Sequence, residues 1–421
     1  MIFKRSTGKM IRPVFASSSK SYTHRALICA ALSDKPSKVA CGPLCDDVKA
    51  TLGCLTALGA QVGYATGEIS VTPIDTSHIP KEAELNCGES ASTLRFLLPV
   101  VTALGTECVF RLTDRMKERI TVDKAFCLDD DNAEWYFDGN GDLHTKGKLS
   151  VCDRRIDTDA SSQMFSGFLL ALPLLKGAKI TPFGSNSSSS YISVTRRIMA
   201  DYGVKVTVDD EGGVTSEGDY ISKNVYVIEG DWSSCSFWLA AGVMGKAPIT
   251  VRGLNVDSLQ ADRKMLEILE RFGADISVYS RRIIASPSKT KGIKVDTSDC
   301  PDLVPVISVL GSVSEGITEI SGVSRLAYKE SNRIDTVCEM INSLGGKADY
   351  RDGKIIITGT GLAGGFVDTH HDHRIAMAAA VASYKADGAV TISDDSCVKK
   401  SYPDFWDDFA LQGGTVYVKG K

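Results

Sequence analysis

Residues Ser161–Leu175 read SSQMFSGFLLALPLL, a short polar opening followed by a long apolar run. A Ser at such an opening is a preferred N-cap residue, and a run that is apolar all round is typical of a buried helix. A repeat of this pattern, at intervals of 68 to 72 residues, predicts six copies of one supersecondary unit. The openings lie at Ser21, Ser90, Ser161, Ser233, Pro301 and His371.

Most copies also contain a second helix that ends at a glycine and leads into a short strand. In the stretch RIMADYGVKVTV, for example, the predicted helix stops before Gly203. Glycine is favoured there because it adopts the left-handed conformation that ends a helix. One copy lacks this glycine, and near residue 131 we expect a degenerate helix followed by a hairpin-like turn. The glycines of the other copies are Gly59, Gly203, Gly273, Gly345 and Gly413.

Each copy alternates strands with two helices, which predicts a mixed α/β fold class. Six units are too many for one core, so we expect three units in each of two domains. The predicted lower domain is 1–18 plus 230–421, and the predicted upper domain is 19–229. The segment MIRPVFA, residues 10–16, precedes the first copy and is expected to pair with the second half. Two crossings, near 17–20 and 228–231, predict a hinge that closes around a ligand.

The composition is that of a water-soluble protein. The 421 residues are 43% hydrophobic and 24% charged, with a formal net charge of −4. This charge gives no general attraction to nucleic acid or to an anionic membrane, so neither is an expected partner. The sequence has no apolar run of about 20 residues and no signal-peptide pattern, so we expect a cytoplasmic protein. The 12 cysteines form no CxxC pair and are predicted to be reduced thiols.

Several cations stand in loops or at helix starts. Lys20, Arg25 and Arg374 lie near predicted helix N-termini, where the helix dipole disfavours a positive charge. Their placement therefore indicates a ligand with several phosphate or carboxylate groups, although each cation alone is equally explained as a solvated side chain. The full set is Lys20, Arg25, Arg119, Lys329, Arg333, Arg374 and Lys400.

Hydroxyl, amide and carboxylate groups accompany these cations. Two carboxylates, Asp302 and Glu330, are candidate proton carriers; the alternatives are a first-turn helix acid and an ion-pair partner for Lys329 or Arg333. The serines open to two interpretations, ligand binding or simple capping and loop formation, include the run SNSSSSYIS. The candidate donors are Ser21, Ser161, Ser162 and Gln163.

Together these residues form a set of motifs that resembles the 5-enolpyruvylshikimate-3-phosphate synthase (3-phosphoshikimate 1-carboxyvinyltransferase) family over essentially the whole chain. The resemblance implies a two-domain inside-out α/β barrel of six βαβαββ repeats, three per domain. It also implies transfer of the enolpyruvyl group of phosphoenolpyruvate to the 5-hydroxyl of shikimate 3-phosphate, with release of phosphate. No metal or cofactor is implied, and we expect a monomer. The motifs are SKS-x-x-x-R, DD, S-x-T-x-R, R-x-K-E-R, SSQ, S-x-x-YI, PD, KES-x-R, DHR-x-AM and KSYPDF.

The resemblance also assigns roles to individual residues. Asp302 is the expected base on the attacking hydroxyl, and Glu330, with Lys20, is the expected acid toward the methylene carbon of phosphoenolpyruvate. The expected phosphoenolpyruvate-binding residues are Lys20, Ala91, Arg119, Gln163, Arg333, Arg374 and Lys400. The expected shikimate-3-phosphate-binding residues are Lys20, Ser21, Arg25, Ser161, Ser162, Gln163, Ser188, Tyr191, Asp302, Arg325 and Lys329.

The chain departs from the family pattern at a few positions. Ala91 replaces a Gly that many members have, which predicts a narrower phosphoenolpyruvate site and weaker inhibition by the phosphonate glyphosate. The loop around Arg119 lacks the usual Pro, and Asn332 replaces a commoner acidic residue. Ser188 is selected from the serine run only by its spacing to Tyr191.

Two alternatives remain from the sequence. The sister enzyme that acts on UDP-N-acetylglucosamine carries a Lys-Asn pair and a loop cysteine, whereas here Ser21 follows Lys20 and residues 115–119 contain no cysteine. A non-catalytic anion-binding relative is expected to lack Asp302 or Glu330, and both are present.

Overall fold

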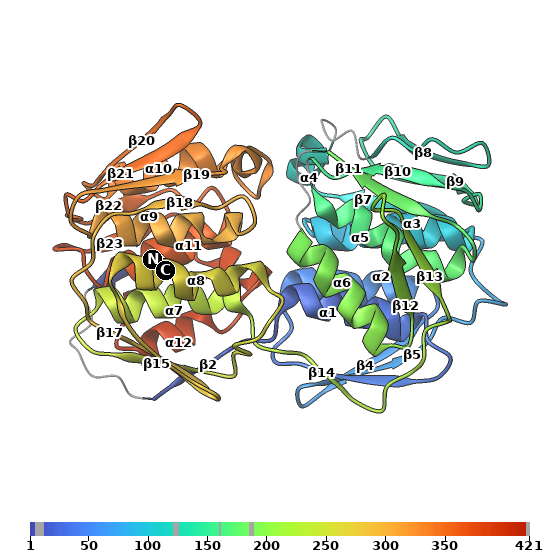
Figure 1. The fold of residues 1–421 in the computed structure, drawn as a ribbon, viewed down its shortest axis with the longest axis horizontal. Helices are drawn as coiled ribbons and strands as arrows, with labels where there is room; N and C mark the ends of the chain where they lie inside the picture. The colour runs from blue at the N-terminus through green and yellow to red at the C-terminus, as the bar shows by residue number, and fades with distance from the viewer. Residues whose placement is uncertain (5–11, 121–125, 160, 185–188, 418–421) are drawn as a thin grey trace. The chain divides into compact units, whose positions relative to one another are not determined.

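The computed structural model describes residues 1–4, 12–120, 126–159, 161–184 and 189–417. The chain divides into two compact units, one of Met1–Ser17 with Glu229–Lys421 and the other of Ser18–Ile228. In the described residues each unit contains three four-stranded sheets and a set of buried helices (Figure 1). This is a mixed α/β fold.

All six sheets share one pairing pattern, in which the first two strands are parallel and the other pairings are antiparallel. The sheets of Ser18–Ile228, in spatial order, are β14 (Tyr226–Val227), β3 (Ser37–Ala40), β5 (Glu68–Thr72) and β4 (Gln61–Ala65); β6 (Glu82–Gly88), β7 (Glu107–Leu112), β9 (Leu143–Gly147) and β8 (Ala133–Phe137); and β10 (Arg154–Asp157), β11 (Ile180–Phe183), β13 (Val214–Glu217) and β12 (Lys205–Val208).

The other unit is built in the same way. Its sheets, in spatial order, are β2 (Val14–Phe15), β15 (Ile249–Arg252), β17 (Arg282–Ser286) and β16 (Asp275–Tyr279); β18 (Lys294–Asp296), β19 (Ile317–Ser321), β21 (Lys354–Thr358) and β20 (Lys347–Arg351); and β22 (Gly365–Val367), β23 (Val390–Ile392), β1 (Ile2–Lys4) and β24 (Thr415–Tyr417). The pairing of β2 with β15 is the one expected for residues 10–16.

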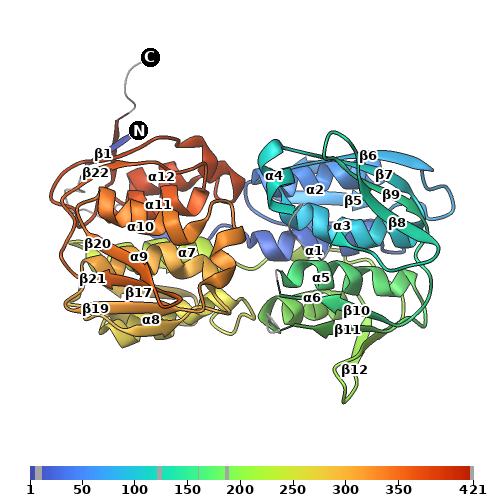
Figure 2. The same ribbon diagram turned by 90° about the horizontal axis from the view of Figure 1, so that it is seen from above.

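Apolar helices form the interior of each unit. In Ser18–Ile228 these are α1 (Lys20–Ala31), α3 (Ala91–Leu104) and α5 (Ser162–Ala171), and in the other unit α7 (Trp232–Met244), α9 (Val304–Ser312) and α11 (His373–Ala382). Figure 2 shows α3 between the β6–β9 sheet and α5, and Figure 1 shows α9 and α11 between the β18–β21 sheet and α7. Their side chains are almost completely buried, as their all-round apolar character predicts.

The second helices are more amphipathic and lie between sheet and solvent. They are α2 (Asp46–Ala57), α6 (Ser189–Asp201), α8 (Met265–Phe272), α10 (Arg333–Ser343) and α12 (Phe405–Leu411), with the short α4 (Asp114–Ile120) in the remaining copy. Four 3-10 turns matter for the site: η3 (Ala261–Lys264), η4 (Pro301–Leu303), η5 (Ser324–Tyr328) and η6 (Ser396–Lys400).

The predicted helix signals are present in the structure, with one exception. Gly203, for example, follows α6 with a φ of 90°, and the other four predicted glycines are also left-handed. The hairpin expected near residue 131 is the β8–β9 pair. The degenerate helix expected there is wrong: residues 127–132 contain no helix, because the run of acidic residues offers no apolar face to bury.

The thiols and the helices also bear on two further expectations. All 12 cysteines are free, and seven of them are buried hydrophobic-core residues in the interior of the units: Cys29, Cys41, Cys45, Cys54, Cys87, Cys108 and Cys235, joined by Cys300 beside η4. None of the helices in the described ranges combines the length and the apolar character that crossing a membrane requires.

Candidate active site

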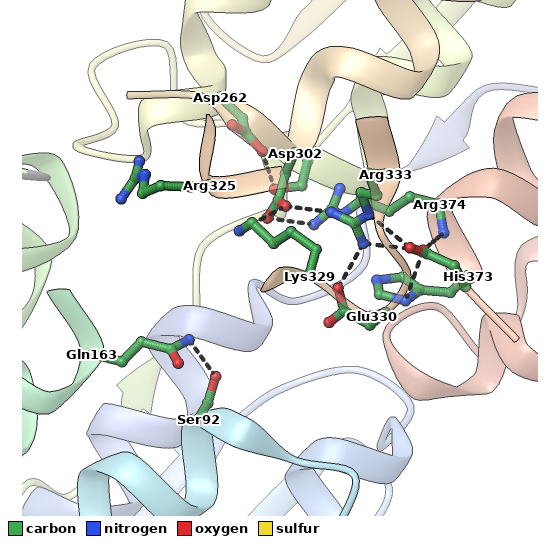
Figure 3. A network of polar contacts seen from close by, with 12 residues as sticks. Ser92, Gln163, Asp262, Asp302, Arg325, Lys329, Glu330, Arg333, His373 and Arg374 are labelled. Carbon is green, nitrogen blue, oxygen red and sulfur yellow. Dashed lines mark hydrogen bonds and ion pairs between the residues drawn. The ribbon is translucent and has the colours of Figure 1, made fainter. Parts of the chain in front are cut away.

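A buried arginine organises one group of predicted residues, in the unit that contains residues 229–421. Arg333 is the first residue of α10, and its side chain has no exposed surface. Its guanidinium donates to Asp302 at 2.8 Å, to Glu330 at 2.8 Å and to Asp372 at 2.7 and 3.0 Å (Figure 3). Five donors on a planar fork suit Arg to this task better than Lys. The N-terminus of α10 is capped by Asn332, whose side chain accepts from the Ile334 amide.

Asp302 receives cations from three segments. Besides Arg333, Lys329 approaches its Oδ1 at 3.3 Å and Arg374 approaches its Oδ2 at 3.1 Å. Burial opposes a charge on this carboxyl, but Arg374, Lys329 and Arg333 outweigh burial and hold the pKa of Asp302 well below its usual range. Its side chain is 19% exposed, so a ligand can still reach it.

Glu330 is the second carboxylate of the group. It follows Lys329 directly in sequence and binds the same Arg333 fork as Asp302, with 15% of its side chain exposed. The pKa of Lys329 is lowered, since burial and the nearby Arg333 disfavour its charge more than Asp302 and Glu330 favour it. The two carboxylates are thus held apart on separate nitrogens of one guanidinium.

Asp372 links this group to α11. It caps α11 by accepting from the Arg374 amide at 2.9 Å, and it also accepts from Arg333. Burial works against its charge, yet Arg333 keeps the pKa of Asp372 below the usual value. The two preceding residues, His370 and His371, have left-handed φ values of 49° and 55°. Such non-glycine conformations are costly, and they mark this turn as one that is held in place by its surroundings.

A further acidic residue, Asp262 of η3, lies close to this group. Its side chain is 1% exposed and accepts a hydrogen bond from Ser233 in the first turn of α7. Burial, followed by the negative charge of Asp302, raises the pKa of Asp262 to about 7, against the opposing effect of Arg374. Sequence reasoning missed Asp262 because SLQADRKM carries no motif signal.

The remaining predicted cations of this unit lie on neighbouring turns. Arg325, on η5, donates to the Ser298 carbonyl. Lys400 ends η6 and is buried, with 8% of its surface exposed.

The second group lies in Ser18–Ile228 and begins with Lys20. Lys20 is the first residue of α1, and its ammonium forms an ion pair with Asp47 at 2.6 Å. Asp47 lies in the first turn of α2 and is buried. This pairing offsets the unfavourable position of a cation at a helix N-terminus. Asp47 belongs to the quoted DD motif but was not among the predicted site residues.

Gln163 connects the starts of α5 and α3. Its amide nitrogen donates to the Ser92 hydroxyl at 2.9 Å, and its amide oxygen accepts from Arg95 at 3.1 Å (Figure 3). Ala91, the first residue of α3, directly precedes Ser92. The structure therefore brings together Gln163 and the turn in which the chain departs from its family.

Arg25 is completely buried inside the unit rather than presented on its surface. Its guanidinium donates to the Thr195 hydroxyl at 2.6 Å and to the Ser21 carbonyl at 2.8 Å, and lies over the Phe96 ring. The Tyr191 ring centroid is 6.0 Å from the guanidinium carbon. Burial lowers the pKa of Arg25 to about 10, which still leaves it charged at neutral pH. In this structure Arg25 ties α1 to α6.

The other predicted residues of this unit are at helix ends. Ser161 caps α5 by accepting from the Gln163 amide, and Ser162 begins that helix. Arg119 lies in the last turn of α4. Ser188 falls outside the described residues.

Comparison with known proteins identifies the family. The model of the family described as EPSP synthase (3-phosphoshikimate 1-carboxyvinyltransferase) matches residues 6–409. The 3-phosphoshikimate 1-carboxyvinyltransferase of Clostridium kluyveri is 38% identical over 403 residues, which cover 94% of each chain. That of Clostridium beijerinckii is 35% identical over 419 residues, covering 97% of this chain and 96% of the relative. The fold matches an EPSP synthase structure from Acinetobacter baumannii with a TM-score of 0.78, at 21% identity and 98% coverage of both chains. The chain belongs to the EPSP synthase family.

Proposed function

We propose that this protein transfers the enolpyruvyl group of phosphoenolpyruvate to the 5-hydroxyl of shikimate 3-phosphate and releases phosphate. Family membership over 94% or more of the chain supports this activity, which is a step of the shikimate pathway toward chorismate and aromatic amino acids. The observation that carries the site assignment is the pair of carboxylates, Asp302 and Glu330, held on one buried guanidinium among further cations.

In this mechanism the two carboxylates move protons in opposite directions. Asp302 accepts the proton of the 5-hydroxyl while that oxygen attacks C2 of phosphoenolpyruvate. Glu330, with Lys20, delivers a proton to the methylene carbon, which becomes a methyl group. The tetrahedral intermediate then expels phosphate, and the same groups reverse their proton roles to restore the carbon–carbon double bond.

Substrate anions make Asp302 a better base. Before they bind, Lys329 and Arg374 both neutralise Asp302, and a carboxylate with so low a pKa is a poor proton acceptor. The proposed assignments turn Lys329 toward shikimate 3-phosphate and Arg374 toward phosphoenolpyruvate. Loss of these two contacts raises the proton affinity of Asp302 only when both substrates are present.

The cations stabilise the charge of the reacting groups. We assign phosphoenolpyruvate to Lys20, Arg119, Gln163, Arg333, Arg374 and Lys400, with Ala91 beside it. We assign shikimate 3-phosphate to Ser21, Arg25, Ser161, Ser162, Ser188, Tyr191, Arg325 and Lys329, with Lys20, Gln163 and Asp302 shared. Fixed Arg and Lys donors around a developing anion need no reorganisation during the reaction.

Several wider features are also proposals. We propose six βαβαββ repeats, three per domain, in an inside-out α/β barrel, and the pairing pattern common to all six sheets supports it. We retain the predicted domains, with hinges near 17–20 and 228–231, as the elements that close on the substrates. Monomeric state and cytoplasmic location are proposed as well; the 12 free thiols suit a reducing compartment.

Phosphate release from phosphoenolpyruvate tests the activity. The purified protein is expected to release phosphate with shikimate 3-phosphate and to show none when the acceptor is omitted. Release with UDP-N-acetylglucosamine instead would favour the sister enzyme, and no release with either acceptor would favour a non-catalytic anion-binding relative.

A further inference from the structure

The buried carboxyl of Asp262 is not used by the proposed mechanism, yet it lies beside that machinery. One of its oxygens, Oδ2, accepts from Ser233, whereas Oδ1 is buried without a hydrogen-bond partner in the described residues. Figure 3 shows Asp262 next to Asp302. A buried carboxylate with an unsatisfied oxygen is costly, whereas a protonated carboxyl in the same place is not.

The charge balance of the neighbouring group also favours the protonated form. Three carboxylates, Asp302, Glu330 and Asp372, already face three cations, Lys329, Arg333 and Arg374. Ionised Asp262 would add a fourth negative charge.

The groups that act on Asp262 come from several elements. From η4 and its N-cap come Asp302 and the Cys300 thiol, from α11 comes Arg374, and from the start of α7 come Ser233 and the capping residue Asp231. Of these, only Arg374 and Ser233 favour the charged form of Asp262. The negative charge on Asp262 and the positive charge on Arg374 are thus directly coupled.

We propose that Asp262 is a positioning residue whose protonation keeps Arg374 available for phosphoenolpyruvate, so that the enzyme binds this substrate best when Asp262 is neutral. The proposal rests on the proposed function. Ionised Asp262 places a negative charge near the cation that receives the substrate anion, and it thereby weakens binding. Asp262 itself does not contact substrate; it acts through Arg374 and Asp302.

The test is the pH dependence of KM for phosphoenolpyruvate, measured by phosphate release at saturating shikimate 3-phosphate between pH 6 and pH 8.5. Asp262→Asn keeps the neutral shape at every pH. We expect KM of the wild type to rise roughly tenfold more than KM of Asp262→Asn over this range, because one charge is gained near Arg374. The titration of the substrate is common to both proteins and cancels in the comparison.

Two further variants make the result specific. Ser233→Ala removes a donor that favours the carboxylate, so it is expected to move the midpoint of the KM rise to higher pH. This variant also carries the test if Asp262→Asn does not fold. Asp257→Asn makes the same formal charge change at an exposed position and is expected to retain the wild-type profile.

Parallel KM profiles for the wild type and Asp262→Asn would overturn the inference, as would an unchanged midpoint in Ser233→Ala. A wild type that releases phosphate yet shows parallel profiles refutes this inference alone. A wild type that releases no phosphate at any pH refutes the proposed function, and the inference with it.

Discussion

The buried position of Asp262 predicts an unusual pH dependence of folding, independent of catalysis. Its pKa rises from 3.8 to about 7 on folding, chiefly through burial and secondarily through Asp302. A carboxyl whose pKa is raised in the folded state binds its proton more tightly there, so its contribution stabilises the fold below pH 4. That contribution is lost as pH rises from about 4 to about 7.

The magnitude follows from the shift. Each unit of pH between the two pKa values costs about 1.4 kcal/mol. Between pH 5 and pH 8 the wild type therefore loses about 2 to 3 kcal/mol from this group, whereas Asp262→Asn loses none of it. The variant is expected to gain stability relative to the wild type by that amount as pH rises.

Urea denaturation at pH 5, 6, 7 and 8 measures the effect. Trp232 and Trp238 lie in the same unit as Asp262 and are fully buried, so their fluorescence reports its unfolding. Equal m-values in both proteins are needed for the comparison of midpoints. Asp257→Asn is the matched exposed control. A constant difference in free energy of unfolding between the wild type and Asp262→Asn across the four pH values would refute the reasoning.

Three other perturbations test the site. Arg333→Met is expected to lower the free energy of unfolding by about 3 to 5 kcal/mol at pH 7, because it leaves buried carboxylates without a partner, whereas Arg351→Met at an exposed position should change it little; urea midpoints decide, and equal losses would contradict the role of the buried cluster. Asp302→Ala and Glu330→Gln should each reduce kcat by about 100-fold or more with smaller changes in KM, and steady-state phosphate release that shows a change in KM alone would mean that they bind rather than transfer protons. Ala91→Gly should lower the glyphosate inhibition constant by about tenfold, because it removes one methyl group from a narrow site; an unchanged constant would sink this interpretation.

Local signals made the helices predictable. The Ser161 cap, the apolar run after it and the stop at Gly203 each depend on residues a few positions apart, and each is present in the structure. The one wrong element, the helix expected at 127–132, came from extending the repeat across a stretch that lacks these signals. Periodicity predicted a copy there, but the acidic residues could not form its buried face.

The candidate site was predictable only in part. Asp302, Glu330 and Arg333 lie in motifs that the sequence displays, so they were found as residue types in a pattern. Their contacts were not predictable, because Asp302 and Arg333 are 31 residues apart and meet only through packing. Asp262 gave no sequence signal, since an acidic residue in a polar stretch is usually exposed.

The sequence by itself determined where helices start and stop, the number of copies and the family, because caps, periodicity and motifs are properties of neighbouring residues. The tertiary structure alone decided which charges face one another. It placed Asp302 among three cations and Asp262 in an apolar interior, and thereby moved two chemically identical carboxyls to opposite pKa shifts. The physical reason is that a pKa depends on burial and on charges within a few ångströms, and only the fold sets both.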